Sequence, residues 1–226
     1  ALLQTSEYLS SFTNNNAIPN HGFDTITNDI KFLSIEDSFL EVGSFRKIAT
    51  LSETVNVLLL FLKKFNDYYP KLNEKAVQVD YTKYIIQKID EVVDKYGEIK
   101  DNASPDLINI RRDMSVVRGK VNQSFGQAMS QYNSLGYLDD IKESFVENRR
   151  VLAVLAMYRR KVKGSILGSS KTGSIAYIEP ETTLKYSREL NNLEYEEREE
   201  ITRILKKLSN EIRPHVALLK QYQEFL

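Results

Sequence analysis

The chain has 226 residues, 42% of them hydrophobic and 27% charged, and its 31 basic residues balance its 31 acidic ones. The chain has only nine Gly and five Pro, the residues that most often mark turns. So few turn residues favour long helices over many short strands. The absence of Cys excludes disulfides and Cys-based metal sites. The sequence contains no run of about 18 uncharged apolar residues, the length that a membrane-spanning helix needs, and no secretory signal is visible. We therefore expect a cytoplasmic protein that has no membrane partner.

The two ends suggest a piece of a longer protein. The sequence begins without Met and stops at Tyr222–Leu226 inside an apolar pattern. We therefore expect truncation at both ends, with part of the function carried by the missing segments.

The N-terminal part predicts helices of different lengths. Residues 1–33 are polar, with loop signals between short helices. A helix is predicted over 44–68, because apolar residues recur at spacings of three and four, and Pro70 should stop it. Another is predicted over 80–95, with Asp80 as its N-cap.

The clearest predicted element is a helix over 104–133. Ser104 suits the N-cap and Pro105 suits the first helical position. Its apolar seam consists of Leu107, Ile110, Met114, Val117, Val121, Phe125, Ala128 and Tyr132. Such a seam needs one partner helix alongside it. A helix over 181–212 has a matching seam inside a very charged surface, and Pro214 should interrupt its continuation.

Between these two helices the hydrophobic period changes to that of strands. The predicted strands are VLAVLAMY (151–158), KVKGSIL (161–167) and SIAYIEP (174–180), with a hairpin turn at 169–173. The predicted fold is mainly α, a long-helix bundle with a small antiparallel β insertion. The expected parts are a helical part over 1–144, the β insertion over 145–180 and a returning helix over 181–226.

Positive charge is concentrated in this insertion. No Asp or Glu occurs between 148 and 178, and the remaining residues of the neutral chain sum to minus seven. The seven basic residues are Arg149, Arg150, Arg159, Arg160, Lys161, Lys163 and Lys171. This pattern suits sequence-independent contact with nucleic-acid phosphates. The alternatives are that the charges protect sheet edges or pair with the Glu-rich stretch 194–200.

Strand alternation limits how many of these charges can reach one partner. In a strand, Arg159 and Lys161 share one face and Arg160 lies on the other, unless the turn begins there. We therefore expect two or three of Arg159, Arg160, Lys161 and Lys163 to contact phosphate.

No residue pattern predicts a catalytic, metal or cofactor site. The loop 168–174 has Ser174 where a phosphate-binding loop needs Lys, so it is interpreted as a hairpin turn. His21 and His215 have no acidic or nucleophilic partner at any signature spacing. We therefore expect no ATP binding and no enzymatic activity from these residues.

Two acidic groups are interpreted as structural. The Glu residues between 194 and 200 should form a solvated face, with i, i+4 pairs Glu194–Arg198 and Glu199–Arg203. Asp139 and Asp140 should form a turn or cap before the β insertion.

Four segments carry a resemblance to a known family: DNASPDLINIRRDM (101–114), NRRVLAVLAMYRRKVKG (148–164), SSKTGSIAYIEP (169–180) and ELNNLEYEEREEITRIL (189–205). Their order and spacing resemble signatures of the second bacterial branch of the MutS family, which lacks the mismatch-reading domain. The resemblance covers the chain from about Leu33 onward. The sequence departs from the pattern at Leu155, where a basic residue is expected, and at Leu167 and Gly168, where His-Asp is usual.

The resemblance implies a core-lever segment and a clamp, upstream of a C-terminal ATPase and often a small nuclease domain. It implies DNA repair, recombination control or related genome and ribosome maintenance. It also implies a full-length homodimer, with ATP and Mg²⁺ only in the ATPase outside this chain. The implied partner is double-stranded or branched DNA, or ribosomal RNA. The alternative is a helical protein-interaction rod whose basic tip docks on an acidic partner or the ribosome.

Overall fold

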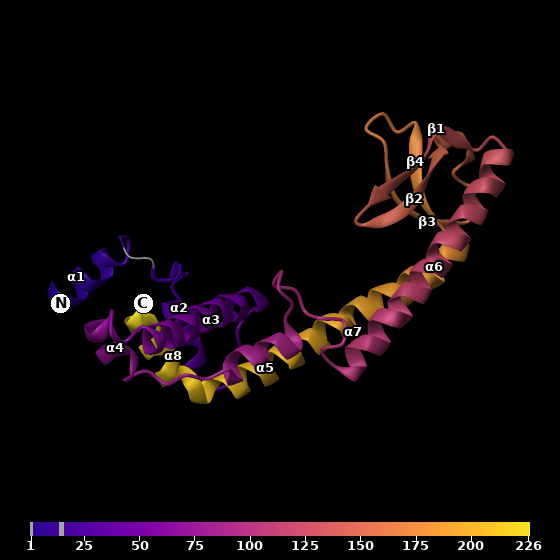
Figure 1. Cartoon of the computed structure of the whole chain (residues 1–226). Coiled ribbons are helices and arrows are strands. Elements are labelled where there is room, and N and C mark those ends of the chain that lie inside the picture. Colours follow the sequence, from indigo (N-terminus) through magenta and orange to yellow (C-terminus); the bar gives the residue numbers. More distant parts are fainter. Residues whose placement is uncertain (1, 14–15) are drawn as a thin grey trace. The chain divides into compact units, whose positions relative to one another are not determined.

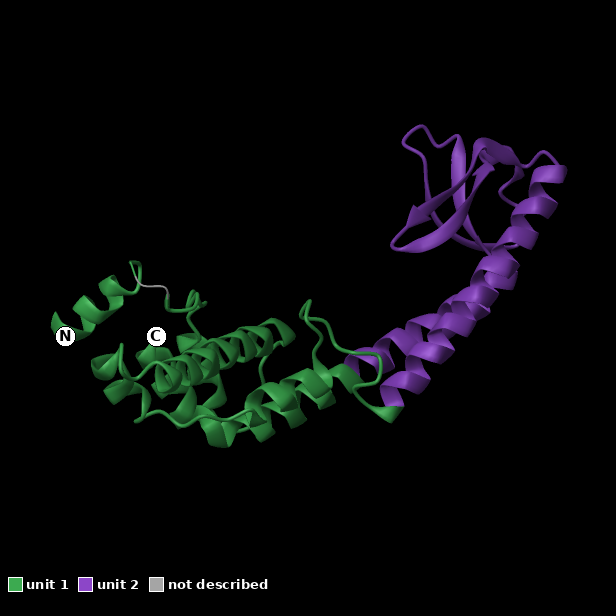
Figure 2. Ribbon diagram, in the orientation of Figure 1, with its two compact units in different colours: residues 1–105, 200–226 green, residues 106–199 purple. Residues whose placement is uncertain are grey.

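The computed structural model describes residues 2–13 and 16–226. Figure 2 shows its two compact units, unit 1 (Ala1–Pro105 and Glu200–Leu226) and unit 2 (Asp106–Glu199). Unit 1 contains α1 (Leu2–Ser10), α2 (Thr27–Leu33), α3 (Val42–Lys64), α4 (Pro70–Ala76), α5 (Tyr84–Val92), η2 (Arg213–His215) and α8 (Val216–Phe225). Unit 2 contains most of α6 (Pro105–Ser134), one four-stranded antiparallel sheet, and the first part of α7 (Glu181–Ile212). The chain is therefore mainly α with a small antiparallel sheet, as its hydrophobic periods predict.

The core of unit 1 is built around α3. One face of this helix is buried, and residues of α2, α5, α8 and the last part of α7 join the same apolar cluster. Helix α3 ends at Lys64, so the predicted end near 68 is wrong. Pro70 begins α4, because a proline suits the first helical position, where its missing N–H costs nothing. Asp80 is not the cap of α5, whose N-cap is Lys83.

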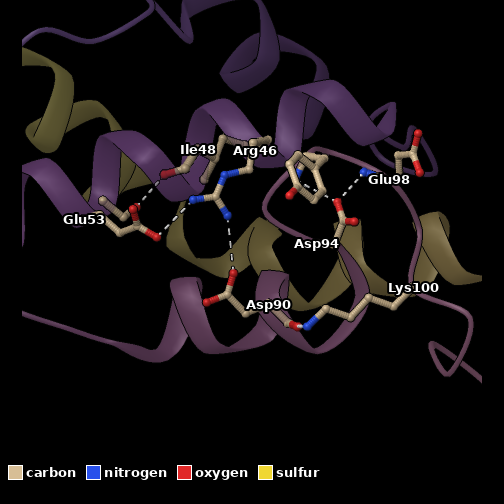
Figure 3. A network of polar contacts seen from close by, with 9 residues as sticks. Arg46, Ile48, Glu53, Asp90, Asp94, Glu98 and Lys100 are labelled. Atoms are coloured by element: carbon tan, nitrogen blue, oxygen red, sulfur yellow. Dashed lines mark hydrogen bonds and ion pairs between the residues drawn. The ribbon is translucent and has the colours of Figure 1, made fainter.

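An arginine links α3 to α5 in unit 1 (Figure 3). The Arg46 guanidinium lies 3.2 Å from the carboxylate of Glu53 and 3.4 Å from that of Asp90. Past the end of α5, the Asp94 carboxylate accepts the backbone N–H of Glu98 at 2.9 Å. This hydrogen bond is the largest cause that lowers the pKa of Asp94 below its usual value. These contacts close the turn after α5 and tie that helix to α3.

In unit 2, α6 and the first part of α7 lie antiparallel (Figure 1). The Arg111 guanidinium is 2.7 Å from the Glu197 carboxylate, and further along α6 the Ser124 hydroxyl is 3.3 Å from that of Thr183. Residue numbers rise along α6 while those of its partners fall along α7. The two predicted long helices are thus partners, with observed bounds within one residue of those expected from the sequence.

The apolar seam of α6 has two partners rather than one. Its last part, with Phe125, Ala128 and Tyr132, belongs to a cluster that includes buried side chains of the sheet. The expectation of a single partner helix for the whole seam is therefore wrong. An apolar stripe on a helix predicts that another surface buries it, but it does not predict whether that surface is a helix or the face of a sheet.

Two acidic residues of α7 have partners besides the i, i+4 pairs expected from the sequence. The Glu200 carboxylate lies 2.7 Å from Arg203, three residues along the same helix. The Glu194 carboxylate lies 4.0 Å from Arg118 of α6. Part of the expected solvated face therefore contributes to the contact between α6 and α7.

The sheet has the strand order β1-β2-β4-β3, and all neighbours are antiparallel. Its strands are β1 (Leu138–Val146), β2 (Arg149–Leu155), β3 (Gly164–Ser169) and β4 (Ile175–Pro180). The expected start of the sheet near 145 is wrong, and Asp139 and Asp140 lie in β1 rather than in a turn or cap. Strand β1 is an edge strand with a register irregularity after Leu138, so it lacks the buried–exposed alternation that marks a strand.

Candidate nucleic-acid interface

Residues 156–163, called here the basic loop, connect β2 to β3. The loop begins as a short 3₁₀ turn, η1 (Ala156–Tyr158), and β3 begins only at Gly164. The expectation that these residues extend two strands is therefore wrong. The alternation that placed Arg159 and Lys161 on one face and Arg160 on the other does not apply.

Contacts at both ends order the basic loop. At its start, the N–H of Ala156 donates to the carbonyl of Ser174 at 2.9 Å. At its end, Val162 is 5% exposed within the cluster that includes the buried side chains of the sheet. The N–H of Lys163 donates to the Tyr132 hydroxyl at 3.2 Å. The loop thus has a defined course, because its backbone bonds and one buried side chain hold it to the sheet and to α6.

The basic loop presents four cations without carboxylate partners. Arg159, Arg160, Lys161 and Lys163 are all exposed, and across residues 2–13 and 16–226 none of them forms an ion pair with an acid. A carboxylate would partly cancel such a charge, so uncompensated cations attract polyanions more strongly.

Aromatic rings position one of these cations. The rings of Tyr137 and Tyr158 stack with 4.6 Å between their centres. The ammonium of Lys161 lies 5.6 Å from the first ring centre and 5.5 Å from the second. Cation–π attraction at such distances restrains the side chain while leaving its charge uncancelled.

Lys171 lies in the turn between β3 and β4, as the predicted hairpin requires. The turn is ordered by hydroxyl contacts, including one of 2.8 Å between Thr172 and Ser174. Because the carbonyl of Ser174 accepts from Ala156, this turn lies beside the start of the basic loop. Lys171 is therefore at the same end of the sheet as that start.

Arg149 and Arg150 differ from the loop residues because both form ion pairs. Arg150 lies 2.6 Å from the Glu143 carboxylate, and its guanidinium sits 4.4 Å from the ring centre of Phe125. Arg149 lies 3.2 Å from Glu179, which is 1% exposed. The other carboxylate oxygen of Glu179, Oε1, is buried and has no hydrogen-bond partner among the described residues. These two arginines therefore stabilise the sheet, and their charges are largely cancelled.

Met157 is a feature that the sequence analysis did not single out. It lies in η1, two residues before the basic run that starts at Arg159, and is 76% exposed. The available signal was its place between an apolar strand and three consecutive basic residues. From the sequence alone, in which the 3₁₀ turn is not evident, Met157 looks like one more residue of a buried strand.

The histidines have neighbours that explain their places. The Nε2 of His21 lies 3.2 Å from the Tyr8 hydroxyl, and the ring of His215 lies 5.1 Å from that of Tyr84. Within the described residues, no cluster of three or more His, Cys, Asp or Glu could hold a metal ion. In the same residues, no helix is long and apolar enough to cross a membrane.

No family model matches the chain. Several curated relatives called Endonuclease MutS2 do match it. The protein of Halothermothrix orenii is 31% identical over 72% of the chain, that of Symbiobacterium thermophilum 28% over 92%, and that of Alkaliphilus oremlandii 26% over 96%. The matched regions cover 21%, 26% and 29% of these relatives, so the chain spans about a quarter of their length. Similarity to several such proteins over most of its length shows that the chain belongs to the MutS2 type of the MutS family.

Proposed function

We propose that this chain is the DNA-contacting lever and clamp region of a MutS2-type protein, and that the basic loop of unit 2 binds the phosphate backbone of duplex DNA. The relatives' name, endonuclease, makes a nucleic acid the first partner to consider. The observation that carries the proposal is the set of four exposed cations without acid partners on an ordered loop.

The chemistry of the loop favours phosphate over base contact. Arg and Lys bind phosphate oxygens by charge-assisted hydrogen bonds, and a guanidinium can do so with two parallel bonds. An ordered loop has less conformational entropy to lose when it binds. Such contacts carry no sequence information directly, so binding should be similar for unrelated duplexes and should weaken with salt.

In this proposal, α6 and α7 are the lever that couples DNA contact to a C-terminal ATPase elsewhere in the full-length protein. Their antiparallel pairing through Arg111 and Glu197 supports a stiff connection within unit 2. ATP and Mg²⁺ would bind to the ATPase rather than to this chain. The full-length protein would act as a homodimer in DNA repair or recombination control.

The test is duplex binding as a function of salt. Four phosphate contacts predict a slope of log affinity against log salt of about −3.6, or roughly a hundredfold loss between about 50 and 200 mM salt. The double variant Arg159→Glu/Lys161→Glu should bind more weakly to every duplex sequence and show a shallower slope. The matched control is Lys206→Glu/Lys207→Glu on α7 in unit 1, which should change binding much less.

Circular dichroism should first establish that each variant is folded. If the folded loop variant binds as the parent does across the salt range, the basic loop does not contact DNA. The alternative function, docking on an acidic protein or on the ribosome, is tested with the same samples. Tighter binding to A-form duplex RNA, or to an acidic polypeptide, than to DNA of equal length would favour it.

A further inference from the structure

Met157 is the most exposed large apolar side chain among the described residues of unit 2, at 76%. It lies at the centre of η1, while most apolar residues of the preceding strand are buried. Exposed in this way, the Met157 side chain buries little apolar surface within the fold. A partner that covered it would remove that surface from water, which is favourable.

The backbone around Met157 is fixed on both sides. The N–H of Leu155 donates to the carbonyl of Tyr137 at 3.0 Å, and the N–H of Arg159 donates to that of Ala156 at 3.3 Å. Tyr158 is held by its ring stack on Tyr137. An ordered 3₁₀ turn therefore presents one flexible, unbranched side chain outward.

The charges near Met157 distinguish it from the exposed apolar residues of β1. Ile141 and Phe145 are 72% and 67% exposed, but they lie in β1, which also contains Asp139, Asp140 and Glu143. Met157 is followed, after Tyr158, by Arg159 and Arg160, which have no acid partner in the described chain. An apolar side chain flanked by uncompensated cations complements a polyanion that also offers an apolar surface.

We propose that Met157 is a wedge that enters the minor groove of duplex DNA and partly unstacks a base step. The inference rests on the proposed function, since the flanking cations must first bring the turn to the phosphates. The minor groove is narrow, about 6 Å, and a tight turn with one protruding unbranched side chain suits it better than a helix does. Architectural proteins insert Met, Leu or Phe between base steps in this way, and Met adapts its shape easily.

A wedge makes binding depend on how easily the duplex deforms. Pyrimidine–purine steps such as TA unstack readily, whereas A-tracts are stiff. The full chain should therefore bind a duplex with central TA steps about three- to tenfold more tightly than an A-tract duplex of equal length. The two duplexes carry the same phosphate charge, so pure backbone contact would give nearly equal affinities.

The experiment compares these duplexes, with the fluorescent base 2-aminopurine placed at the central step to report unstacking. The parent should raise the fluorescence on the TA duplex. Met157→Gln, similar in size but polar, should lose both the preference and the fluorescence rise and keep the salt slope. Met157→Leu should retain both. Phe145→Gln is the matched control for an exposed apolar residue of the same sheet, and it should behave as the parent.

The outcomes separate the wedge from the proposed function. If Met157→Gln matches the parent on both duplexes while Arg159→Glu/Lys161→Glu loses binding, the wedge is wrong and phosphate contact stands. If the parent binds neither duplex, the proposed function itself fails. If the parent binds an acidic polypeptide better than DNA and Met157→Gln weakens that binding, Met157 is a protein contact and the wedge is also wrong.

Discussion

Gly164 directly follows the basic loop, at the start of β3, where this strand passes close to the backbone of β4. A Cβ atom at this position would lie 2.1 Å from the carbonyl oxygen of Glu179. Because that oxygen belongs to a paired strand, it cannot move without disturbing the sheet. We expect Gly164→Ala to lower the stability of unit 2 by roughly 1–3 kcal/mol, the usual cost of forcing atoms into a packed site. Thermal or urea unfolding followed by circular dichroism measures the loss.

Gly168, in the same strand, is the matched control for this substitution. A Cβ there would meet its nearest neighbour, an atom of the Tyr177 ring, at 3.8 Å, an ordinary contact distance. Gly168→Ala should therefore lower the free energy of unfolding much less than Gly164→Ala does. Equal losses for the two substitutions would contradict the steric argument, since both remove a glycine from β3.

At the scale of residues, the sequence identified the charges but not their partners. Lys161 and Arg150 look alike in a stretch without acids, yet one is exposed on a loop and the other forms an ion pair with Glu143. Strand pairing brings Glu143 to Arg150, seven residues apart. Likewise, Glu179 reaches Arg149 across thirty residues. Local sequence cannot show such pairing because it depends on strand register.

Glu200 makes a prediction at the scale of an element, α7. Its carboxylate, 7% exposed, accepts hydrogen bonds from Arg203 and from the hydroxyl of Ser104. The hydrogen bond from Arg203 is the largest cause that lowers the pKa of Glu200 below its usual 4.5. Since the folded pKa lies below the unfolded one, the stabilisation is present above about pH 4.5 and is lost as pH falls through the folded value.

Thermal melting between pH 7 and pH 3 tests this contribution. The melting temperature of the parent should fall more over this range than that of Glu200→Gln, because the glutamine side chain has nearly the same shape but cannot titrate. Glu199→Gln, one residue earlier on α7, should keep the steep acid loss of the parent. Parallel acid profiles for the parent and Glu200→Gln would show that this carboxylate does not stabilise the fold.

At the element scale, the sequence predicted long elements better than short ones. The seams of α6 and α7 run over many turns, so a one-residue error at an end does not hide the helical period. Strand β1 was missed because an edge strand is only partly buried. Strand β2 was drawn too long because the apolar run continues into η1, where Met157 turns outward. Backbone pairing, rather than hydrophobicity, decides where these strands end.

At the scale of the whole molecule, the neutral total charge hides local differences. Residues 106–199, which form unit 2, contain fifteen Lys and Arg and thirteen Asp and Glu. The unit as a whole is therefore only slightly basic, and its long-range field should steer DNA weakly. Binding must then depend on the local, uncompensated charge of the basic loop rather than on net charge.

The two apolar clusters predict that DNA contact belongs to unit 2 alone. All members of one cluster lie within 106–199, and all members of the other lie within unit 1, so they share no residue. Residues 106–199, expressed alone and verified as folded by circular dichroism, should bind duplex DNA with the same salt slope as the full chain. The slope of log affinity against log salt depends on the number of phosphate contacts, whereas the affinity also depends on how well residues 106–199 are ordered before binding. A slope that is shallower by about 0.9 for each lost contact would show that unit 1 also binds phosphate, because the four loop cations are all retained.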